Sequence, residues 1–299
     1  MDTLIYNISK LLHISTDGAK NKRGNVLGLF PMTENAWLRI AGDRIHSFGE
    51  MKNLPDLNSF ESIDAEGGMI FPTYVDSHTH LVYSGTREDE FGKRLHGYSY
   101  EQIANEGGGI LNSAKKVANA SEDELYAAAA IRLEEVMQLG TGAIEIKSGY
   151  GLSTESEIKL LKTAKRLGAN YPLPVKTTFL GAHAFPEKFK NDHDAYVQLI
   201  INEMLPEIAS QNLADYIDVF CEKGYFNVDQ MVEILEAAKK HNIKSKLHLN
   251  QFNILNSIEI ADKYNALSVD HLEVMSENDI EILGKSDTIA TLLPGCSLF

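Results

Sequence analysis

The sequence predicts an α/β fold in which parallel strands alternate with helices and close into a barrel. From residue 70 onward, short runs rich in β-branched residues alternate with longer stretches of helical periodicity, a pattern typical of parallel sheets. About seven strands follow in series, and so many favour a barrel over an open sheet. The chain has 299 residues, 43% of them hydrophobic, which is enough for one large domain and a small companion.

The first 66 residues are predicted to form the small companion, a β domain of short strands joined by turns. Weak alternation indicates a strand at 3–8, and residues 36–40 meet 44–48 across Ala41-Gly42-Asp43, which is a hairpin signal. A further strand is expected at 59–65. So few strands cannot close a core alone, so we expect this domain to be incomplete without C-terminal segments of the chain.

Residues 67–299 are predicted to form the barrel. Hydroxyl caps followed by acids at 121–124 and 153–157 mark two helix starts. The glycine run at 107–109 is interpreted as a close-approach loop, because no strand precedes it and no Lys-Ser/Thr follows it, as a phosphate loop would need. The predicted helices span 100–118 (interrupted by the glycines at 107–109), 121–139, 154–169, 193–211, 228–241, 255–264 and 277–283. The predicted strands span 70–75, 143–146, 175–180, 216–220, 245–249, 267–269 and 288–293.

Composition limits the classes of function. A net charge of -14 with no basic stripe argues against a nucleic-acid surface. The two cysteines, Cys221 and Cys296, have neither metal-ligand spacing nor a disulfide framework, which fits a reducing compartment. The start lacks a basic region ahead of an apolar run, and no apolar stretch approaches membrane-spanning length. We therefore expect a cytoplasmic protein.

The candidate site begins with His78 and His80, which follow the first strand of the predicted barrel. In an extended chain, side chains two residues apart point to the same side, so this pair can hold one metal ion. Two imidazoles suit zinc, iron or nickel better than magnesium or calcium. A chance pair is the alternative, and the position at the end of an apolar run weighs against it.

More residues that could bind metal or take part in chemistry follow the later strands, where the functional groups of parallel barrels gather. A lone histidine at a strand end is more often structural than a ligand. Five histidines at the ends of four strands are harder to attribute to chance. In chain order the strand-end residues are His78 and His80; Glu145, Lys147, Ser148, Gly149 and Tyr150; Gly181, Ala182 and His183; Glu222; His248, Asn250 and Gln251; and Asp270, His271 and Glu273.

This arrangement indicates a metal-dependent hydrolase acting on a C–N or C–O bond. A metal held by two histidines of one strand and one of another, with an open position, activates water at neutral pH and polarises a carbonyl or amidine. A nearby histidine can act as acid, base or donor to developing charge. Arg87 could bind a substrate carboxylate through two parallel hydrogen bonds, or form a surface ion pair with Glu88 or Glu90.

Together these motifs resemble the imidazolonepropionase family, enzymes of histidine degradation in the amidohydrolase superfamily. The resemblance runs through essentially the whole chain. His-x-His alone would indicate only the superfamily, whereas the runs Lys-Ser-Gly-Tyr-Gly-Leu at 147–152 and Phe-Leu-Gly-Ala-His at 179–183 are specific to the family. The other matching segments are 71–80, 85–91, 106–110, 145–146 and 270–273.

The resemblance implies a metal-dependent-hydrolase (β/α)8 TIM-type barrel, here lacking strand eight, beside a small N-terminal β-sandwich-like domain. It implies hydrolysis of the ring amide of 4-imidazolone-5-propanoate to N-formimidoyl-L-glutamate, and a homodimer when the chain is full length. The implied site residues are His78, His80 and His248 for zinc or iron, Arg87, Tyr150, His183 and Gln251 for substrate binding, and His271, His183 and Gln251 for catalysis.

Two departures from the family pattern bear on activity. Where the family commonly has Asp and Glu after the strand-five histidine, this chain has Asn250 and Gln251, and an amide cannot exchange a proton as a carboxylate does. The family's last metal ligand, an aspartate after strand eight, lies beyond Phe299. We therefore expect a truncated chain with hydrolysis near background. The alternatives are a related amidohydrolase or deaminase acting on another ring, and a non-catalytic fragment.

Overall fold

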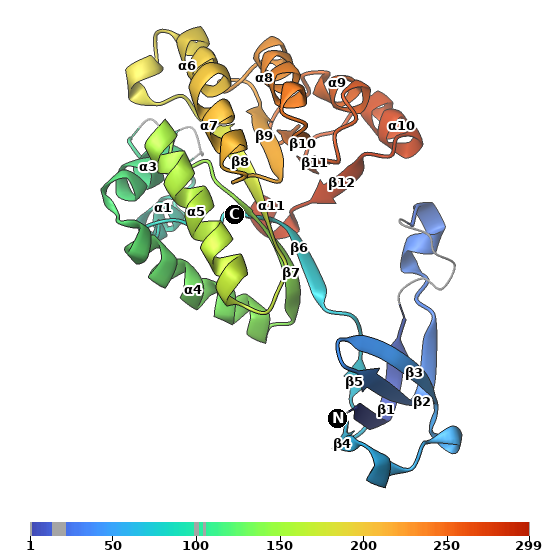
Figure 1. Cartoon of the computed structure of the whole chain (residues 1–299). Helices are drawn as coiled ribbons and strands as arrows, with labels where there is room; N and C mark the ends of the chain where they lie inside the picture. Colours follow the sequence, from blue (N-terminus) through green and yellow to red (C-terminus); the bar gives the residue numbers. More distant parts are fainter. Residues whose placement is uncertain (1, 14–21, 99–101, 104–105, 299) are drawn as a thin grey trace. The chain divides into compact units, whose positions relative to one another are not determined.

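The computed structural model describes residues 2–13, 22–98, 102–103 and 106–298 of the chain. These residues form two compact units, Met1–Tyr74 and Val75–Phe299 (Figure 1). The sequence placed the boundary after residue 66, whereas the structure places it after Tyr74. The difference arises because strand β5, Met69–Ile70, still pairs with the first strand of the small unit.

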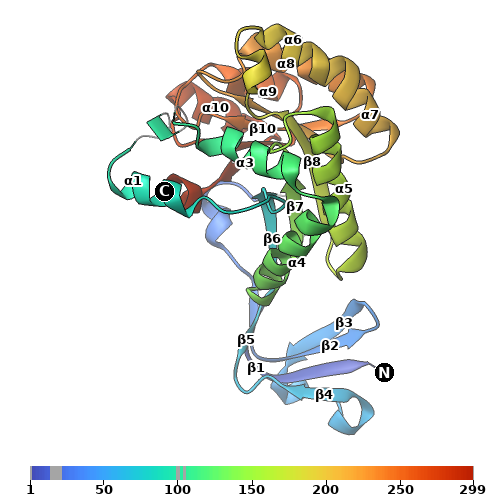
Figure 2. The same cartoon turned by 90° about the vertical axis from the view of Figure 1, so that its left-hand side faces the viewer.

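The small unit is a five-stranded mixed sheet in the order β3-β2-β1-β4, with β5 also pairing with β1 (Figure 2). Its hairpin is confirmed, and Gly42 has the positive φ of +59° that the turn requires. Ile8, Leu11, Ala36 and Leu38 form its small core. The strands are β1 Thr3–Leu12, β2 Met32–Ala41, β3 Arg44–Glu50 and β4 Glu61–Asp64, with short 3-10 turns at Gly24–Gly28, Met51–Asn53 and Leu57–Ser59.

The larger unit contains a seven-stranded sheet in the order β12-β11-β10-β9-β8-β7-β6, so strands that follow one another along the chain are also neighbours in the sheet. The pairings from β7 to β12 are parallel. This is the predicted TIM-type barrel wall. Its strands are β6 Tyr74–Thr79, β7 Thr141–Lys147, β8 Val175–Ala182, β9 Tyr216–Cys221, β10 Lys244–Leu249, β11 Ser268–His271 and β12 Ile289–Leu292.

The first barrel strand differs from its prediction. The sequence placed it at 70–75, but Ile70 belongs to β5 of the small unit and β6 runs from Tyr74 to Thr79. Pro72 lies between them and has no N–H to donate to a ladder, so the apolar run is divided there. Val75, expected to be buried, is 70% exposed. His78 therefore lies within the strand, and His80 directly after it.

Helices separate the strands of the barrel, and the predicted starts are confirmed. The side chains of Ser121 and Ser153 accept hydrogen bonds from the backbone N–H groups of Glu124 and Ser156. The helix predicted at 193–211 is interrupted by a π-helical turn, Ile200–Met204. The helices are α1 Glu88–Leu95, α3 Gly109–Asn119, α4 Glu122–Gln138, α5 Thr154–Asn170, α6 His193–Leu199, α7 Leu205–Ser210, α8 Val228–Lys240, α9 Ser257–Lys263, α10 Glu277–Lys285 and α11 Pro294–Leu298, with a 3-10 turn at Glu187–Phe189.

Three differences concern helices near the site. Helix α1 and the short α11 were not predicted. Of the helix predicted at 100–118, the structure has α3 from Gly109 onward, and residues 106–108 before it are not helical. Residues 99–101 and 104–105 of this region lie outside the described residues. Gly108 is indeed a close approach, because a Cβ there would lie 2.7 Å from the side chain of Ile103.

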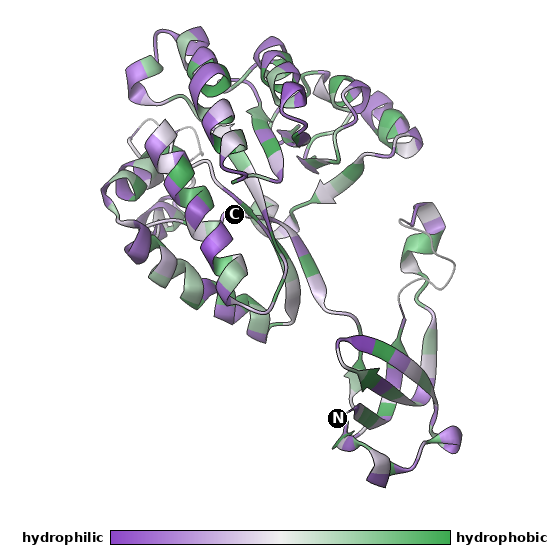
Figure 3. Ribbon diagram, viewed as in Figure 1, coloured by the Kyte–Doolittle hydropathy of each residue, from purple (hydrophilic) through white to green (hydrophobic). Residues whose placement is uncertain are grey.

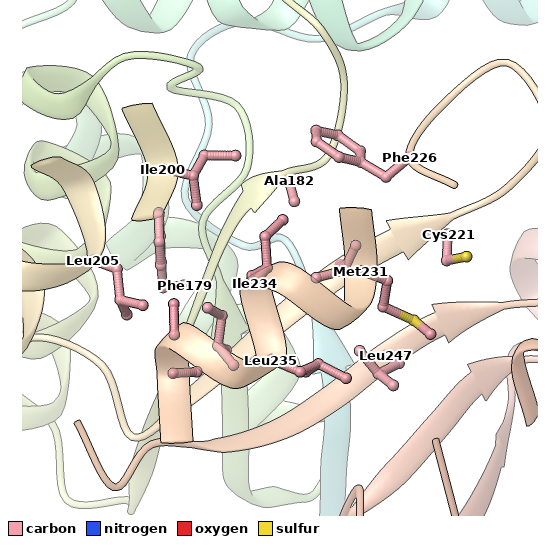
Figure 4. Packing of buried hydrophobic residues seen from close by; sticks show 14 of the residues in the cluster. Phe179, Ala182, Ile200, Leu205, Cys221, Phe226, Met231, Ile234, Leu235 and Leu247 are labelled. Atoms are coloured by element: carbon pink, nitrogen blue, oxygen red, sulfur yellow. The ribbon is translucent and has the colours of Figure 1, made fainter. Parts of the chain in front are cut away.

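Packing of helices on the sheet forms the main core of the larger unit. Helix α5 packs on β8, and α8 packs on β9 and β10. Figure 4 shows Met231, Ile234 and Leu235 of α8 among Phe179 of β8 and Leu247 of β10. The helices carry hydrophobic and hydrophilic residues in alternation (Figure 3), as expected for helices with one buried face. Among the described residues, no helix is both long enough and apolar enough to cross a membrane.

Candidate metal centre and active site

The barrel unit brings together the five histidines that the sequence placed at strand ends. His78 lies in β6, His80 directly after it, His183 directly after β8, His248 in β10, and His271 ends β11. The ring centroids of His78 and His248 are 4.4 Å apart, those of His80 and His183 5.0 Å, and those of His248 and His271 5.0 Å. The shared location at the carboxyl ends of parallel strands explains this convergence.

Three of these histidines have the geometry of a metal site. One ring nitrogen from each of His78, His80 and His248 lies within 4.8 Å of the others. Nδ1 of His78 is 2.6 Å from an oxygen of Asp270, and Nδ1 of His248 is 2.8 Å from an oxygen of Asp218. An ionised carboxylate only accepts hydrogen bonds, so each Nδ1 donates and each Nε2 keeps its lone pair.

The donor set fits a zinc or iron ion. Nδ1 of His80 lies 3.2 Å from the backbone carbonyl of Ser148, which again leaves Nε2 as the acceptor. Burial, with the charges of neighbouring histidines, lowers the pKa of His80 and His248 well below the usual value, so both imidazoles are neutral, as ligands must be. Among the described residues, Nε2 of His248 is the buried side-chain polar atom that has no hydrogen-bond partner.

Behind these histidines lies a buried charge cluster. Nζ of Lys147 is 2.8 Å from Glu145, 2.8 Å from Asp218 and 3.4 Å from Asp270. Burial alone would lower the pKa of Lys147, but the three carboxylates outweigh it and raise that pKa. Burial alone would raise the pKa of Asp270, but His78 and Lys147 hold it well below its usual range. The cluster thus keeps Asp270, the acceptor behind His78, ionised.

A cavity of about 270 Å³ opens beside the histidines. Arg87 lies in its wall, with its guanidinium 6.0 Å from the centroid of the Tyr150 ring. Nη1 of Arg87 is 3.7 Å from an oxygen of Glu90, a loose contact that leaves the fork able to take a carboxylate. The cavity is lined by His78, Thr79, His80, Arg87, Ile110, Tyr150, His183, Phe220, His248, Gln251, Phe252, His271, Leu293 and Cys296.

The two remaining histidines have one nitrogen fixed from behind. Nδ1 of His183 is 3.0 Å from the backbone carbonyl of Gly149, and burial lowers the pKa of His183 to about 4. Nδ1 of His271 is 3.3 Å from a carboxylate oxygen of Glu273. Burial and the nearby His78 lower the pKa of His271, although Glu273 opposes them. Both rings are therefore neutral at pH 7 and able to accept a proton.

Several predicted strand-end residues do not line the cavity, among them Glu222 and Asn250. Glu222 is buried, and its carboxylate accepts from the backbone N–H of Phe252 at 2.8 Å and from the side chain of Asn253 at 2.9 Å. Asn250 donates to Asp279 at 3.3 Å. Both support the loop after β10, on which Gln251 reaches the cavity.

Asp218 was missed at the sequence level. It lies inside an apolar strand, Tyr216–Cys221, and is only 1% exposed. An acid in such a strand needs a buried partner, and this signal could have identified it. Phe220, which also lines the cavity, gave no signal beyond that of a core residue.

Comparison by sequence shows that the chain is similar to curated imidazolonepropionases, although no family model matches it. Over 299 residues the chain is 52% identical to an imidazolonepropionase of Christiangramia forsetii and 51% identical to one of Flavobacterium johnsoniae. Each match covers the whole of this chain and 73% of the relative.

Solved structures with the same fold are far more distant in sequence. Guanine deaminase from C. acetobutylicum with bound guanine matches with a TM-score of 0.61 at 15% identity, over 98% of this chain and 68% of that chain. Atrazine chlorohydrolase TrzN from Arthrobacter aurescens TC1, complexed with zinc, matches with a TM-score of 0.66 at 12% identity, over 99% and 66%. Likeness at this level concerns the fold alone.

Proposed function

This chain belongs to the imidazolonepropionase family of the amidohydrolase superfamily, and from that premise we propose that it hydrolyses the cyclic amide C–N bond of 4-imidazolone-5-propanoate, giving N-formimidoyl-L-glutamate. The observation that carries the proposal is the group of His78, His80 and His248 beside a cavity that also contains Arg87. A cyclic amide with an anionic arm matches both features, since one end needs a polarised carbonyl and the other a cation.

His78, His80 and His248 would hold one zinc or iron ion per chain. When bound, such an ion supplies a Lewis acid for the amide carbonyl and lowers the pKa of water. Asp270 and Asp218 orient two of the ligands by accepting from Nδ1. Three histidines suit zinc or iron alike, so the metal itself is left to elemental analysis.

Substrate orientation would depend on Arg87, Tyr150 and Gln251. The guanidinium of Arg87 is always charged and can donate two parallel hydrogen bonds to the propanoate carboxylate. Tyr150 lies between this cation and the histidines, 5.3 Å from the ring centroid of His80. The side-chain amide of Gln251 can both donate to and accept from polar atoms of the substrate ring.

Proton transfer would fall to His271. Its neutral ring can take a proton from the attacking water at Nε2, while Glu273 stabilises the imidazolium through Nδ1. Returning that proton to the ring nitrogen as the C–N bond breaks balances the hydrolysis. His183, with its proton on Nδ1, would accept a hydrogen bond from the substrate at Nε2. Gln251 cannot exchange protons and is given no such step.

The experiment measures loss of the substrate's ultraviolet absorbance by zinc-loaded protein at the full length of its imidazolonepropionase relatives, of which this chain spans 73%. The same assay is carried out in parallel on a matched ring compound that lacks the propanoate arm. We expect turnover of the propanoate substrate to depend on the metal and to exceed turnover of the armless ring by tenfold or more, the worth of one charge-assisted pair. Equal turnover of both rings would replace this proposal with an amidohydrolase or deaminase of another substrate.

We also propose the cytoplasm as the location and a homodimer as the assembly. Cys221 and Cys296 are both free thiols, which suits a reducing compartment. Fractionation of cells and the mass of the purified protein in solution test these two points separately.

A further inference from the structure

A buried carboxylate lies behind the loop that joins β7 to α5. Glu157 is in the first turn of α5, where acids usually face solvent, yet it is 0% exposed. One of its oxygens accepts from the backbone N–H groups of Gly151 at 2.7 Å and Leu152 at 2.8 Å. The other accepts from the N–H of Gly149 at 3.0 Å. The hydroxyl of Ser148 adds a further hydrogen bond.

The loop that Glu157 binds has an unusual conformation. Leu152 has a φ of +53°, a left-handed value that leucine rarely adopts. Gly149 has a φ of +105°, and a Cβ there would lie 2.7 Å from Nδ1 of His183. A Cβ on Gly151 would lie 2.4 Å from the backbone nitrogen of Glu157. A conformation of this kind persists only where its surroundings hold it. The Glu157 carboxylate accepts from three of the four backbone N–H groups between Gly149 and Leu152, all except that of Tyr150.

The same loop reaches the active site at two points. The backbone of Gly149 links Glu157 to His183. Its N–H donates to the Glu157 carboxylate, and its carbonyl oxygen accepts a hydrogen bond from Nδ1 of His183 at 3.0 Å. A carbonyl cannot donate, so this contact keeps the proton of His183 on Nδ1. Tyr150 follows directly, with its ring centroid 5.4 Å from that of His183.

We propose that Glu157 is a positioning residue of this site: its carboxylate holds the loop at 148–152 so that the Gly149 carbonyl selects the Nδ1–H tautomer of His183 and Tyr150 faces the cavity. What the tautomer does in catalysis rests on the proposed function, but the positioning itself does not. Glu157 touches neither the cavity nor the substrate and acts only through the loop.

The test is Glu157→Gln in the full 299-residue chain. Glutamine has the same size, but its NH2 group would face backbone donors, so at least one of the three backbone hydrogen bonds is lost. Two-bond 1H–15N correlation spectra report the ring nitrogens of His183, and a His183→Gln variant identifies its signals. We expect Nδ1–H in the parent chain and a substantial population of Nε2–H in the variant. The matched control is Glu155→Gln, an exposed acid of the same helical turn, which should leave the His183 signals unchanged.

A folded Glu157→Gln chain with unchanged His183 signals would overturn the proposal, as would an Nε2–H tautomer in the parent. If the variant does not fold, amide hydrogen exchange in the parent chain tests the proposal instead. Gly149, Gly151 and Leu152 should exchange as slowly as amides inside α5, and rapid exchange would show that Glu157 does not hold them. If the tautomer shift is seen but a full-length version fails to hydrolyse the substrate, this inference is retained and the proposed function is rejected.

Discussion

Asp218 holds His248 by two bonds from one carboxylate. One oxygen accepts from the backbone N–H of His248 at 3.0 Å, and the other is 2.8 Å from its Nδ1. Main chain and ring are therefore oriented together, and Nε2 is directed to a place where the described residues offer it no partner. A buried imidazole nitrogen left in this way costs free energy unless a ligand binds it, so this single residue already indicates a metal.

His248→Ala should abolish tight metal binding. Loss of one of three histidine ligands removes the group that is most firmly oriented. Elemental analysis after loading with zinc and desalting should give one ion per parent chain and far less than one in the variant. His241→Ala, which removes an exposed histidine outside the site, is the control. Equal zinc in the parent and in His248→Ala would contradict the assignment.

Arg87→Lys should weaken recognition of the propanoate arm. Lysine keeps the charge but cannot make two parallel hydrogen bonds, and a charge-assisted pair is worth about 1.5–3 kcal/mol. In a full-length version of the protein, we expect kcat/KM for 4-imidazolone-5-propanoate to fall by about ten- to a hundredfold. Turnover of the armless ring should be the same in the parent and the variant. A comparable loss on both rings would mean that Arg87 supports the fold and not the arm.

At the scale of elements, the charge cluster joins strands that are not adjacent in the sheet and meet across the barrel interior. Lys147 at the end of β7 contacts Asp218 of β9 and Asp270 of β11. Lys246 of β10 contacts Glu145 of β7 at 2.5 Å. These cross-strand contacts fix the relative positions of the strands that carry the metal ligands. The barrel's interior is therefore polar beneath the site, unlike the apolar layer between sheet and helices.

Lys147→Met should destabilise the barrel unit. Methionine fills a similar volume but leaves three buried carboxylates without their shared cation, and breaking a buried pair costs about 3–5 kcal/mol. The urea dependence of unfolding measures this difference. Lys240→Met, an exposed lysine in the last turn of α8, should change the free energy of unfolding by less than about 0.5 kcal/mol. A similarly small change for Lys147→Met would show that hydration or protonation of the three carboxylates compensates for the loss of the lysine charge.

At the scale of the whole molecule, every residue that lines the cavity belongs to the unit Val75–Phe299. The small unit has its own core of four buried residues and contributes no residue to the lining of the cavity. The chain spans 73% of the length of its imidazolonepropionase relatives. Metal binding should therefore be linked to the folding of one unit and not of the other.

Zinc should raise the unfolding temperature of the barrel unit alone. At a free concentration a hundredfold above Kd, a ligand that binds only the folded state adds about 2.7 kcal/mol. Calorimetry with zinc and then with chelator should shift the transition of the larger unit and leave that of the small unit in place. Leu38→Ala, in the core of the small unit, identifies the second transition by lowering it. A single transition that shifts as a whole would show that the two units unfold together.

Local patterns in the sequence determined most of the elements and the membership of the site. Strand–helix alternation depends on side-chain periodicity and caps such as Ser121, which are local properties, so they predict elements well. The five histidines were identifiable because parallel topology collects strand ends at one edge. Local patterning failed at 70–75, where an apolar run looked like one strand but Pro72 lies between two strands, β5 and β6.

Only the tertiary structure decided which groups stand behind the histidines. Asp218 and Asp270 lie 30 and 192 residues from the histidines they orient, and no local pattern pairs residues across such distances. The same holds for the inward turn of Glu157, which its sequence position in a first helical turn would assign to solvent. These pairings follow from burial: once the strands close, each buried carboxylate must find a donor or a cation within reach, and the fold determines which one that is.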